Sequence, residues 1–177
     1  DLDCRIPAGP GNDEISTLIR DFNGMAGALA GQQQALRESE RRFREMYERA
    51  PLPYQSLDAA GTILDVNDAW LGLFDRTKED VKGRFIGDFL TEDSQAVLGE
   101  RFARFKRDKH TEDNIFEIVR GDGGRRLVSV NGRVSHDADG EFLCTHCILT
   151  DVTARIEHEQ HLRLSASVFA HANEAIA

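Results

Sequence analysis

A seven-residue repeat of apolar positions runs without a break through the first part of the chain. Its first positions are Ile15, Phe22, Leu29, Leu36, Phe43 and Ala50, and its fourth positions are Leu18, Met25, Gln32, Ser39 and Met46. Apolar residues spaced alternately three and four apart form one stripe along a helix, as in coiled coils and four-helix bundles. The pattern predicts one long helix from residue 15 to residue 50 that packs against partner helices.

The middle of this predicted helix is weaker than its ends. Gly24, Gly27 and Gly31 lie within it, and each costs roughly 1 kcal/mol of helix stability relative to alanine. Gln32 and Ser39 place polar side chains in the apolar stripe, where they weaken packing and help to set the register. We therefore expect helix packing to be loosest around these residues.

The pattern changes at Pro51 and Pro53, which end the helix because proline lacks an amide hydrogen and disfavours helix before it. Beyond them the chain predicts strands at 54–58, 62–66, 114–120, 126–134 and 141–150, with helices at 69–74, 77–81 and 94–107. Asn67 precedes the first of these helices as a cap, and Thr77 with Asp80 resembles a capping box. The order predicts an α+β fold with an antiparallel sheet and its helices gathered in the middle.

Alternation along the last three strands predicts one almost wholly apolar sheet face. Its members are Phe116, Ile118, Val128, Val130, Val134, Leu143, Thr145, Cys147 and Leu149. The opposite face mixes apolar residues such as Ile115 and Ile148 with polar ones. We expect the flanking helices to cover those apolar residues.

Composition and charge narrow the classes of partner. The 177 residues carry a net charge of −9, and the basic residues are interspersed with acidic ones. Without a basic patch, we expect no nucleic-acid partner. Three cysteines make no even disulfide framework, which favours a reducing compartment. The sequence contains no long apolar run of the kind that spans a membrane. Because it starts at Asp1 and stops within a predicted helix, we expect it to be an internal part of a longer protein.

Several short motifs, taken together, resemble the PAS domain family over about residues 44–153. They are Asn67-Asp68-Ala69-Trp70, Glu79-Asp80-Val81-Lys82-Gly83, the strand pair hinged at Gly123, Asp139-Gly140-Glu141 and Asp151-Val152-Thr153. The resemblance implies a PAS fold, which is a five-stranded antiparallel sheet with helices on one face. It also implies a small internal cavity and dimerisation through flanking helices.

Two further resemblances flank this region. Residues 1–6, with 13–15 and 22–25, resemble the connector and second helix of a HAMP domain, and residues 162–176 resemble the start of a second PAS domain. We therefore expect a partial HAMP domain at 1–35, a coiled-coil helix at 36–50, a PAS domain at 51–152 and an exit helix at 153–177. The HAMP resemblance implies a parallel homodimer on the cytoplasmic side of the bacterial inner membrane. It implies contact with the membrane only through a missing upstream segment.

The resemblance also implies a cavity for a small molecule. Its candidate lining residues are Trp70, Phe74, Phe102, Phe105, Phe116, Ile118, Thr145 and Cys147. Flavin-binding light sensors of the family carry a cysteine after Gly83, but residues 84–89 contain none. Haem-binding members usually use a histidine on the long helix, but residues 94–107 contain none. Haem and flavin are therefore disfavoured, and no cofactor is evident. A small apolar or amphipathic ligand and a core simply filled by these side chains both stay open.

Other polar groups are given structural interpretations. Cys144 and Cys147 form a CxxC pair, but residues three apart on a strand point to opposite faces and cannot share a metal. We interpret both as buried structural cysteines. His158 and His161 lack a third ligand, so we expect a solvated helix face and no metal site.

A second polar pair stands where the last predicted strand passes into the exit helix. Asp151 ends the strand, and Thr153 can cap the helix. In the PAS family this junction couples the sheet to the helix that leads to the output module. We expect Asp151 and Thr153 to have that signal-coupling role.

No nucleophile paired with a base and no phosphate-binding glycine loop is evident, so we predict that this fragment is not an enzyme. We predict a sensory input module that couples HAMP and PAS states to a downstream output domain through dimeric helices. The alternative is a ligand-free dimerisation and relay spacer. The output domain stays open, with a cyclic-dinucleotide enzyme or a histidine kinase favoured over a chemoreceptor.

Overall fold

The predicted long helix forms in one piece. The computed structural model describes residues 14–174, and α1 covers Glu14–Glu48. The chain divides into two compact units, at residues 1–47 and 48–177. Along α1, the apolar seam residues Leu18, Phe22, Met25, Leu29, Leu36, Phe43 and Met46 are 46–73 % exposed. A single chain therefore leaves this stripe open. The predicted HAMP connector, at residues 1–6, lies outside the described residues.

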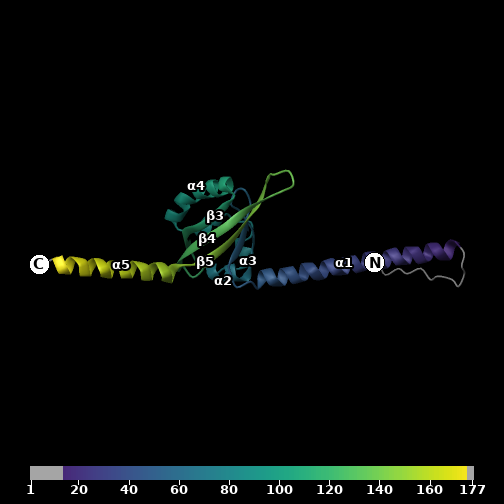
Figure 1. Ribbon diagram of the computed structural model, residues 1–177, viewed down its shortest axis with the longest axis horizontal. Helices are drawn as coiled ribbons and strands as arrows, with labels where there is room; N and C mark the ends of the chain where they lie inside the picture. Colours follow the sequence, from purple (N-terminus) through teal and green to yellow (C-terminus); the bar gives the residue numbers. More distant parts are fainter. Residues whose placement is uncertain (1–13, 175–177) are drawn as a thin grey trace. The chain divides into compact units, whose positions relative to one another are not determined.

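A five-stranded antiparallel sheet forms the second unit, with the strand order β2-β1-β5-β4-β3. The strands are β1 (Tyr54–Leu57), β2 (Ile63–Val66), β3 (His110–Val119), β4 (Arg125–His136) and β5 (Phe142–Asp151). The helices are α2 (Asp68–Phe74), α3 (Lys78–Val81), the 3₁₀ helix η1 (Ile86–Phe89), α4 (Glu92–Asp108) and α5 (Thr153–Glu174). Figure 1 shows β3, β4 and β5 running together beside α4. The predicted α+β fold with a five-stranded antiparallel sheet is confirmed.

Local capping chemistry positions the short helices as predicted. The side-chain oxygen of Asn67 accepts hydrogen bonds from the backbone N–H groups of Trp70 at 3.1 Å and Tyr54 at 2.9 Å. Asn67 therefore starts α2 and also holds it to β1. Thr77 and Asp80 form a reciprocal capping box at α3. These bonds satisfy backbone donors that a short helix leaves free.

The core lies between the helices and the inner face of the sheet. Trp70 and Phe74 stack with ring centroids 3.7 Å apart, and both are almost fully buried. The Trp70 indole N–H donates to the side-chain oxygen of Gln55, which is itself buried on β1. The edge of Phe89 meets both rings. An aromatic cluster with its one indole donor satisfied thus fixes α2 on the sheet.

The start of α4 covers the outer edge of β3. The Ser94 hydroxyl accepts the Glu117 N–H at 2.8 Å, and the Thr91 N–H donates to the Glu117 carbonyl at 3.0 Å. Further along, the Arg101 guanidinium donates to the Ile115 carbonyl at 2.7 Å. These bonds occupy backbone groups that an edge strand would otherwise present to other chains.

Three expectations differ from the structure. The third strand begins at His110, earlier than its apolar pattern indicates, because pairing with β4 extends across a bulge between Thr111 and Asn114. Leu143 is exposed although alternation places it on the apolar face. The reason is that the β4–β5 hairpin extends beyond the helices, as Figure 1 shows. On the opposite face, Ile115 and Ile148 are not covered within this unit.

Candidate functional site

The exit junction joins the end of β5 to the start of α5. The Thr153 hydroxyl oxygen accepts a hydrogen bond from the Leu127 N–H of β4 at 2.9 Å, and the Val152 N–H donates to the Leu127 carbonyl at 2.8 Å. The Asp151 carboxylate accepts the Thr153 N–H at 2.9 Å. Asp151 therefore supplies the helix-start acceptor, and the Thr153 side chain, predicted as a cap, bonds to β4. We expected the Thr153 side chain to cap α5, but its hydroxyl bonds to the Leu127 N–H because β4 lies close to it.

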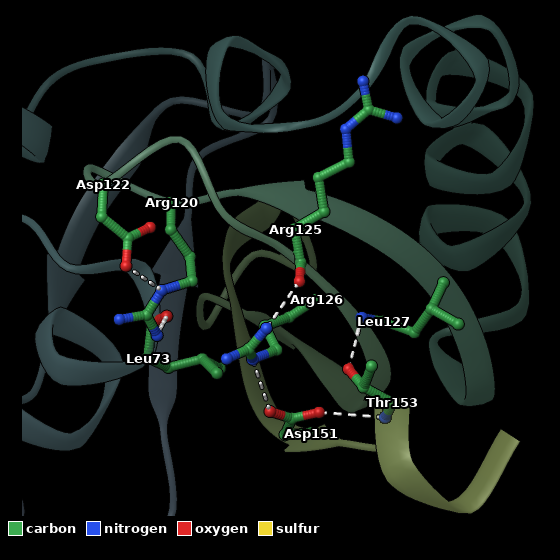
Figure 2. Close-up of polar contacts among 8 residues, drawn as sticks. All are labelled: Leu73, Arg120, Asp122, Arg125, Arg126, Leu127, Asp151 and Thr153. Carbon is green, nitrogen blue, oxygen red and sulfur yellow. Dashed lines mark hydrogen bonds and ion pairs between the residues drawn. The ribbon is translucent and has the colours of Figure 1, made fainter. Parts of the chain in front are cut away.

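A chain of polar contacts leads away from this junction. Figure 2 shows Arg126 between Asp151 and the Arg125 carbonyl, with its Nε 3.6 Å from the Asp151 carboxylate. Both side chains of the ion pair are more than two-fifths exposed. Solvent screens an ion pair of this kind, so it contributes little to stability. The other oxygen of the Asp151 carboxylate accepts the Thr153 N–H at the start of α5.

The turn between β3 and β4 reaches the end of α2. The Arg120 guanidinium donates to the Leu73 carbonyl at 2.8 Å, and the Gly121 N–H donates to the Phe74 carbonyl at 2.9 Å (Figure 2 shows the Arg120 contact). Both acceptors belong to the last turn of α2, whose carbonyls have no partner within the helix. The Gly124 N–H is the main group that holds the pKa of Asp122 below its usual range, and Arg120 adds to the effect. The turn is therefore fastened to α2 at one end and to β4 at the other.

A cavity of about 50 Å³ lies between α4 and the sheet. Its walls include six of the predicted lining residues: Phe74, Phe102, Phe105, Phe116, Ile118 and Cys147. Trp70 and Thr145 do not line it. Trp70 donates to Gln55, and the Thr145 hydroxyl accepts the Leu57 N–H at 3.1 Å, so both face β1 in the packed core. The surface of the wall is mainly apolar.

The size of the cavity limits what this conformation can hold. A buried water needs roughly 10–15 Å³ of such space, and pockets for drug-sized ligands are about 300–1,000 Å³. The cavity therefore has room for a few atoms. A larger ligand would require Phe102 or its neighbours to move. Phe102 is only partly buried, so it is the aromatic wall with the most freedom.

Sequence reasoning missed the polar residues of this wall, which are Gln55, Arg101, Thr111 and Asn114. Arg101 lies over the Phe116 ring at 5.1 Å while its guanidinium bonds to the Ile115 carbonyl. The strand register of β3 shifts at the bulge between Thr111 and Asn114. As a result both side chains lie on the inner face, where Asn114 donates a hydrogen bond to the Thr111 hydroxyl. The register of β3 across its bulge could not be read from periodicity.

A second junction at the end of α1 was also missed. The Lys78 ammonium lies 2.9 Å from the Glu48 carboxylate and 3.1 Å from the Asp65 carboxylate. Burial opposes the charge on Lys78, but hydrogen bonds to Glu48 and then Asp65 outweigh it and raise the pKa of Lys78. The last residue of α1 is thus held to α3 and β2 by one cation.

The two cysteines of the CxxC pair differ in environment. Cys147 is buried, and this burial raises the pKa of its thiol to about 11. Cys144 is only half-buried, so the interpretation of both as buried is wrong for this residue. It lies on the opposite face of β5, near the open hairpin end of the strand. His158 and His161 are exposed on α5 as expected.

Residues 14–174 contain no cluster of three or more His, Cys, Asp or Glu side chains suited to a metal ion. Within the same residues, no helix combines the length and apolar character required to cross a bilayer.

Comparisons with known proteins agree with this geometry. Residues 54–154 match the family model of the PAS domain, and residues 1–31 match that of the HAMP domain. No curated protein matches the chain.

Several solved structures share the fold. The PAS domain of an HTR-like protein from Haloarcula marismortui is 24 % identical, with a TM-score of 0.61 over 69 % of this chain and 98 % of that one. A PAS domain from a two-component sensor histidine kinase is 14 % identical, with a TM-score of 0.53 over 64 % of this chain and 98 % of that one. An RNA-binding light-oxygen-voltage receptor is 17 % identical, with a TM-score of 0.65 over 72 % of this chain and 37 % of that one. With its sheet, cavity and matched motifs, the chain belongs to the PAS domain family, and a HAMP domain precedes the PAS domain.

Proposed function

We propose that this sensory module transmits its state through paired helices to a downstream output domain. The observation that carries the proposal is the bond between Leu127 and Thr153, which makes the start of the exit helix part of the sheet. A shift of β4 therefore acts directly on α5. At the other end, Lys78 holds the last residue of α1 to the same domain.

The route from the cavity to the exit helix is short. Phe74 lines the cavity and ends α2, whose carbonyls are bonded by Arg120 and Gly121. From that turn β4 leads to Leu127 and the exit junction. A ligand that displaced Phe102 and Phe74 would pass that displacement through Arg120 and Gly121 to β4. Such a ligand shifts signalling only if it binds the two states of the module with different affinity.

The exposed seam of α1 supports a parallel homodimer. A row of apolar side chains at heptad spacing is unstable in water unless a partner covers it. The HAMP match at residues 1–31 is typical of proteins anchored in a membrane. It supports a position on the cytoplasmic side of the bacterial inner membrane. The output domain would be a cyclic-dinucleotide enzyme or a histidine kinase.

Crosslinking tests this proposal in the parent protein. Met46→Cys and Leu162→Cys place thiols on exposed apolar positions of α1 and α5, in a background without the native cysteines. Arg41→Cys is the control, since residue 41 is also exposed but lies on the opposite side of the heptad. We expect Met46→Cys to crosslink between chains and Arg41→Cys not to. The extent of crosslinking at Met46→Cys and at Leu162→Cys should differ between active and inactive protein. Identical crosslinking patterns in the two states would contradict the proposed coupling.

The small cavity favours a second candidate, a ligand-free spacer that relays HAMP motion. Native mass spectrometry separates the two candidates. A co-purified small molecule of constant mass supports sensing. A ligand-free protein whose crosslinks still respond to the upstream signal supports the spacer.

A further inference from the structure

Three chemically active side chains meet on the sheet face opposite the cavity. The Tyr54 hydroxyl is hydrogen-bonded to His146 Nδ1, and the Cys144 sulfur lies 3.6 Å from His146 Nε2. Cys144 and His146 are two residues apart on β5, so they share a face. Tyr54 comes from the neighbouring strand β1, where it pairs with Ile148. The proposed sensing mechanism uses none of the three.

The arrangement leaves each ring nitrogen of His146 with one partner. When Nδ1–H donates to the Tyr54 oxygen, Nε2 is free to accept the proton of the Cys144 thiol. A nucleophile in contact with a base, and the base oriented by a third group, is the arrangement that activates thiols. Burial and, after it, the neighbouring Cys144 raise the pKa of Tyr54 to about 12, so its phenol stays neutral beside the imidazole.

The charged groups around the cluster come from β4 and β2. Arg133 of β4 is the register partner of His146 and therefore stands on the same face. Asp65 of β2 acts on Tyr54, but its carboxylate is also paired with Lys78 at 3.1 Å. The neighbour of Cys144 across the ladder is the uncharged Ser135. On this face His146 thus has a cation as its register partner, and Cys144 has no acid directly across from it.

Cys147 provides an internal contrast on the same strand. It is only 2 % exposed and lies against the core, where it lines the cavity. Cys144 is accessible and has a base beside it. The two thiols of one CxxC pair are therefore chemically different.

We propose that Cys144 is a site of reversible modification by small disulfides, with His146 as its base and Tyr54 as the residue that positions His146. The Cys144 thiol passes its proton to His146 Nε2, and the thiolate attacks one sulfur of the disulfide. A new S–S bond forms as the old one breaks, and the departing thiolate takes the proton from the imidazolium. An external thiol reverses the step. The site gives the module a chemical input separate from the cavity.

The test measures thiol reactivity in the full chain carrying Cys4→Ser, with 4,4′-dithiodipyridine as the disulfide probe. We expect one fast-reacting thiol, lost in Cys144→Ser and kept in Cys147→Ser. At about pH 6, His146→Asn should slow it about tenfold, because the thiol then has no base to take its proton. Tyr54→Phe should move the midpoint of the rate–pH profile while leaving the maximal rate largely unchanged.

Thermal melting of each variant separates loss of reactivity from loss of fold, and His146→Gln serves as a second replacement of the base. A folded His146→Asn protein that reacts as fast as the parent overturns the proposal. So does a Cys144 thiol that reacts no faster than N-acetylcysteine at the same pH.

Discussion

The backbone N–H of Leu127 donates its hydrogen bond to the side chain of Thr153, at 2.9 Å. At this point β5 has ended, and the hydroxyl takes the place of a strand carbonyl as the acceptor. The Val152 N–H completes the pairing by donating to the Leu127 carbonyl. Rotation or withdrawal of α5 must therefore break a hydrogen bond that the β4 backbone donates.

Thr153→Val tests the energetic value of this bond. Valine has nearly the same shape but leaves the partly buried Leu127 N–H without its acceptor, which costs roughly 1–3 kcal/mol. Urea unfolding should show this loss, and Thr153→Ser should retain most of the stability. Equal stability of the valine and serine variants would show that water replaces the hydroxyl without cost.

Trp70→Phe tests the buried bond between α2 and β1. The change removes the indole donor of Gln55 and some core volume, and we expect a loss of roughly 2–3 kcal/mol. Adding Gln55→Met should recover part of this loss, because no polar atom is then left unpaired. Urea unfolding of the single and double variants measures the coupling. Additive losses would mean that the bond between the two side chains contributes little.

Gly132 and Gly99 form a matched pair. A Cβ at residue 132 would lie 2.5 Å from the Cys147 sulfur and 2.8 Å from the His146 carbonyl oxygen, whereas at residue 99 it meets nothing within 4 Å. Gly132→Ala should therefore destabilise the domain by roughly 1–3 kcal/mol through overpacking. Gly99→Ala, inside α4, should stabilise it by up to about 1 kcal/mol. Thermal melting should move in opposite directions, and a parallel change would contradict the packing of β4 on β5.

Alkaline pH should weaken the fold through Cys147. Burial raises the pKa of its thiol from 9.0 to about 11, so the unfolded chain releases this proton at lower pH than the folded one does. Stability from this group is complete below pH 9.0 and is lost as the pH rises to about 11. The difference between these two values corresponds to roughly 2–3 kcal/mol.

Denaturant unfolding at the two ends of this pH range checks the prediction. Cys147→Ala should be less stable at neutral pH because of the lost packing, but its stability should fall less steeply with rising pH. The same slope in both proteins would mean that other groups cause the alkaline loss.

Much of the fold could be predicted because its signals are local. The heptad spacing from Phe22 to Met46 predicts α1, since one helix turn brings every third or fourth residue to one side. Asn67 and the Thr77–Asp80 box predict helix starts because their side chains bond to backbone within three residues. The PAS resemblance implied a cavity, and Phe74, Phe102, Phe105 and Phe116 among its predicted lining residues are part of the wall.

Tertiary structure alone decided which polar groups meet. Lys78 bonds to Glu48 thirty residues away, Thr153 reaches Leu127 across twenty-six, and Tyr54 reaches His146 across ninety-two. These contacts depend on strand order and on the exact offset between neighbouring strands. A shift of one residue along β1 or β5 would send Tyr54 or His146 to the other face. The volume left between Phe102 and the sheet depends likewise on how several segments pack together. A sequence determines the periodicities that build helices and strands, whereas the sum of their packing energies determines the register that brings their side chains together.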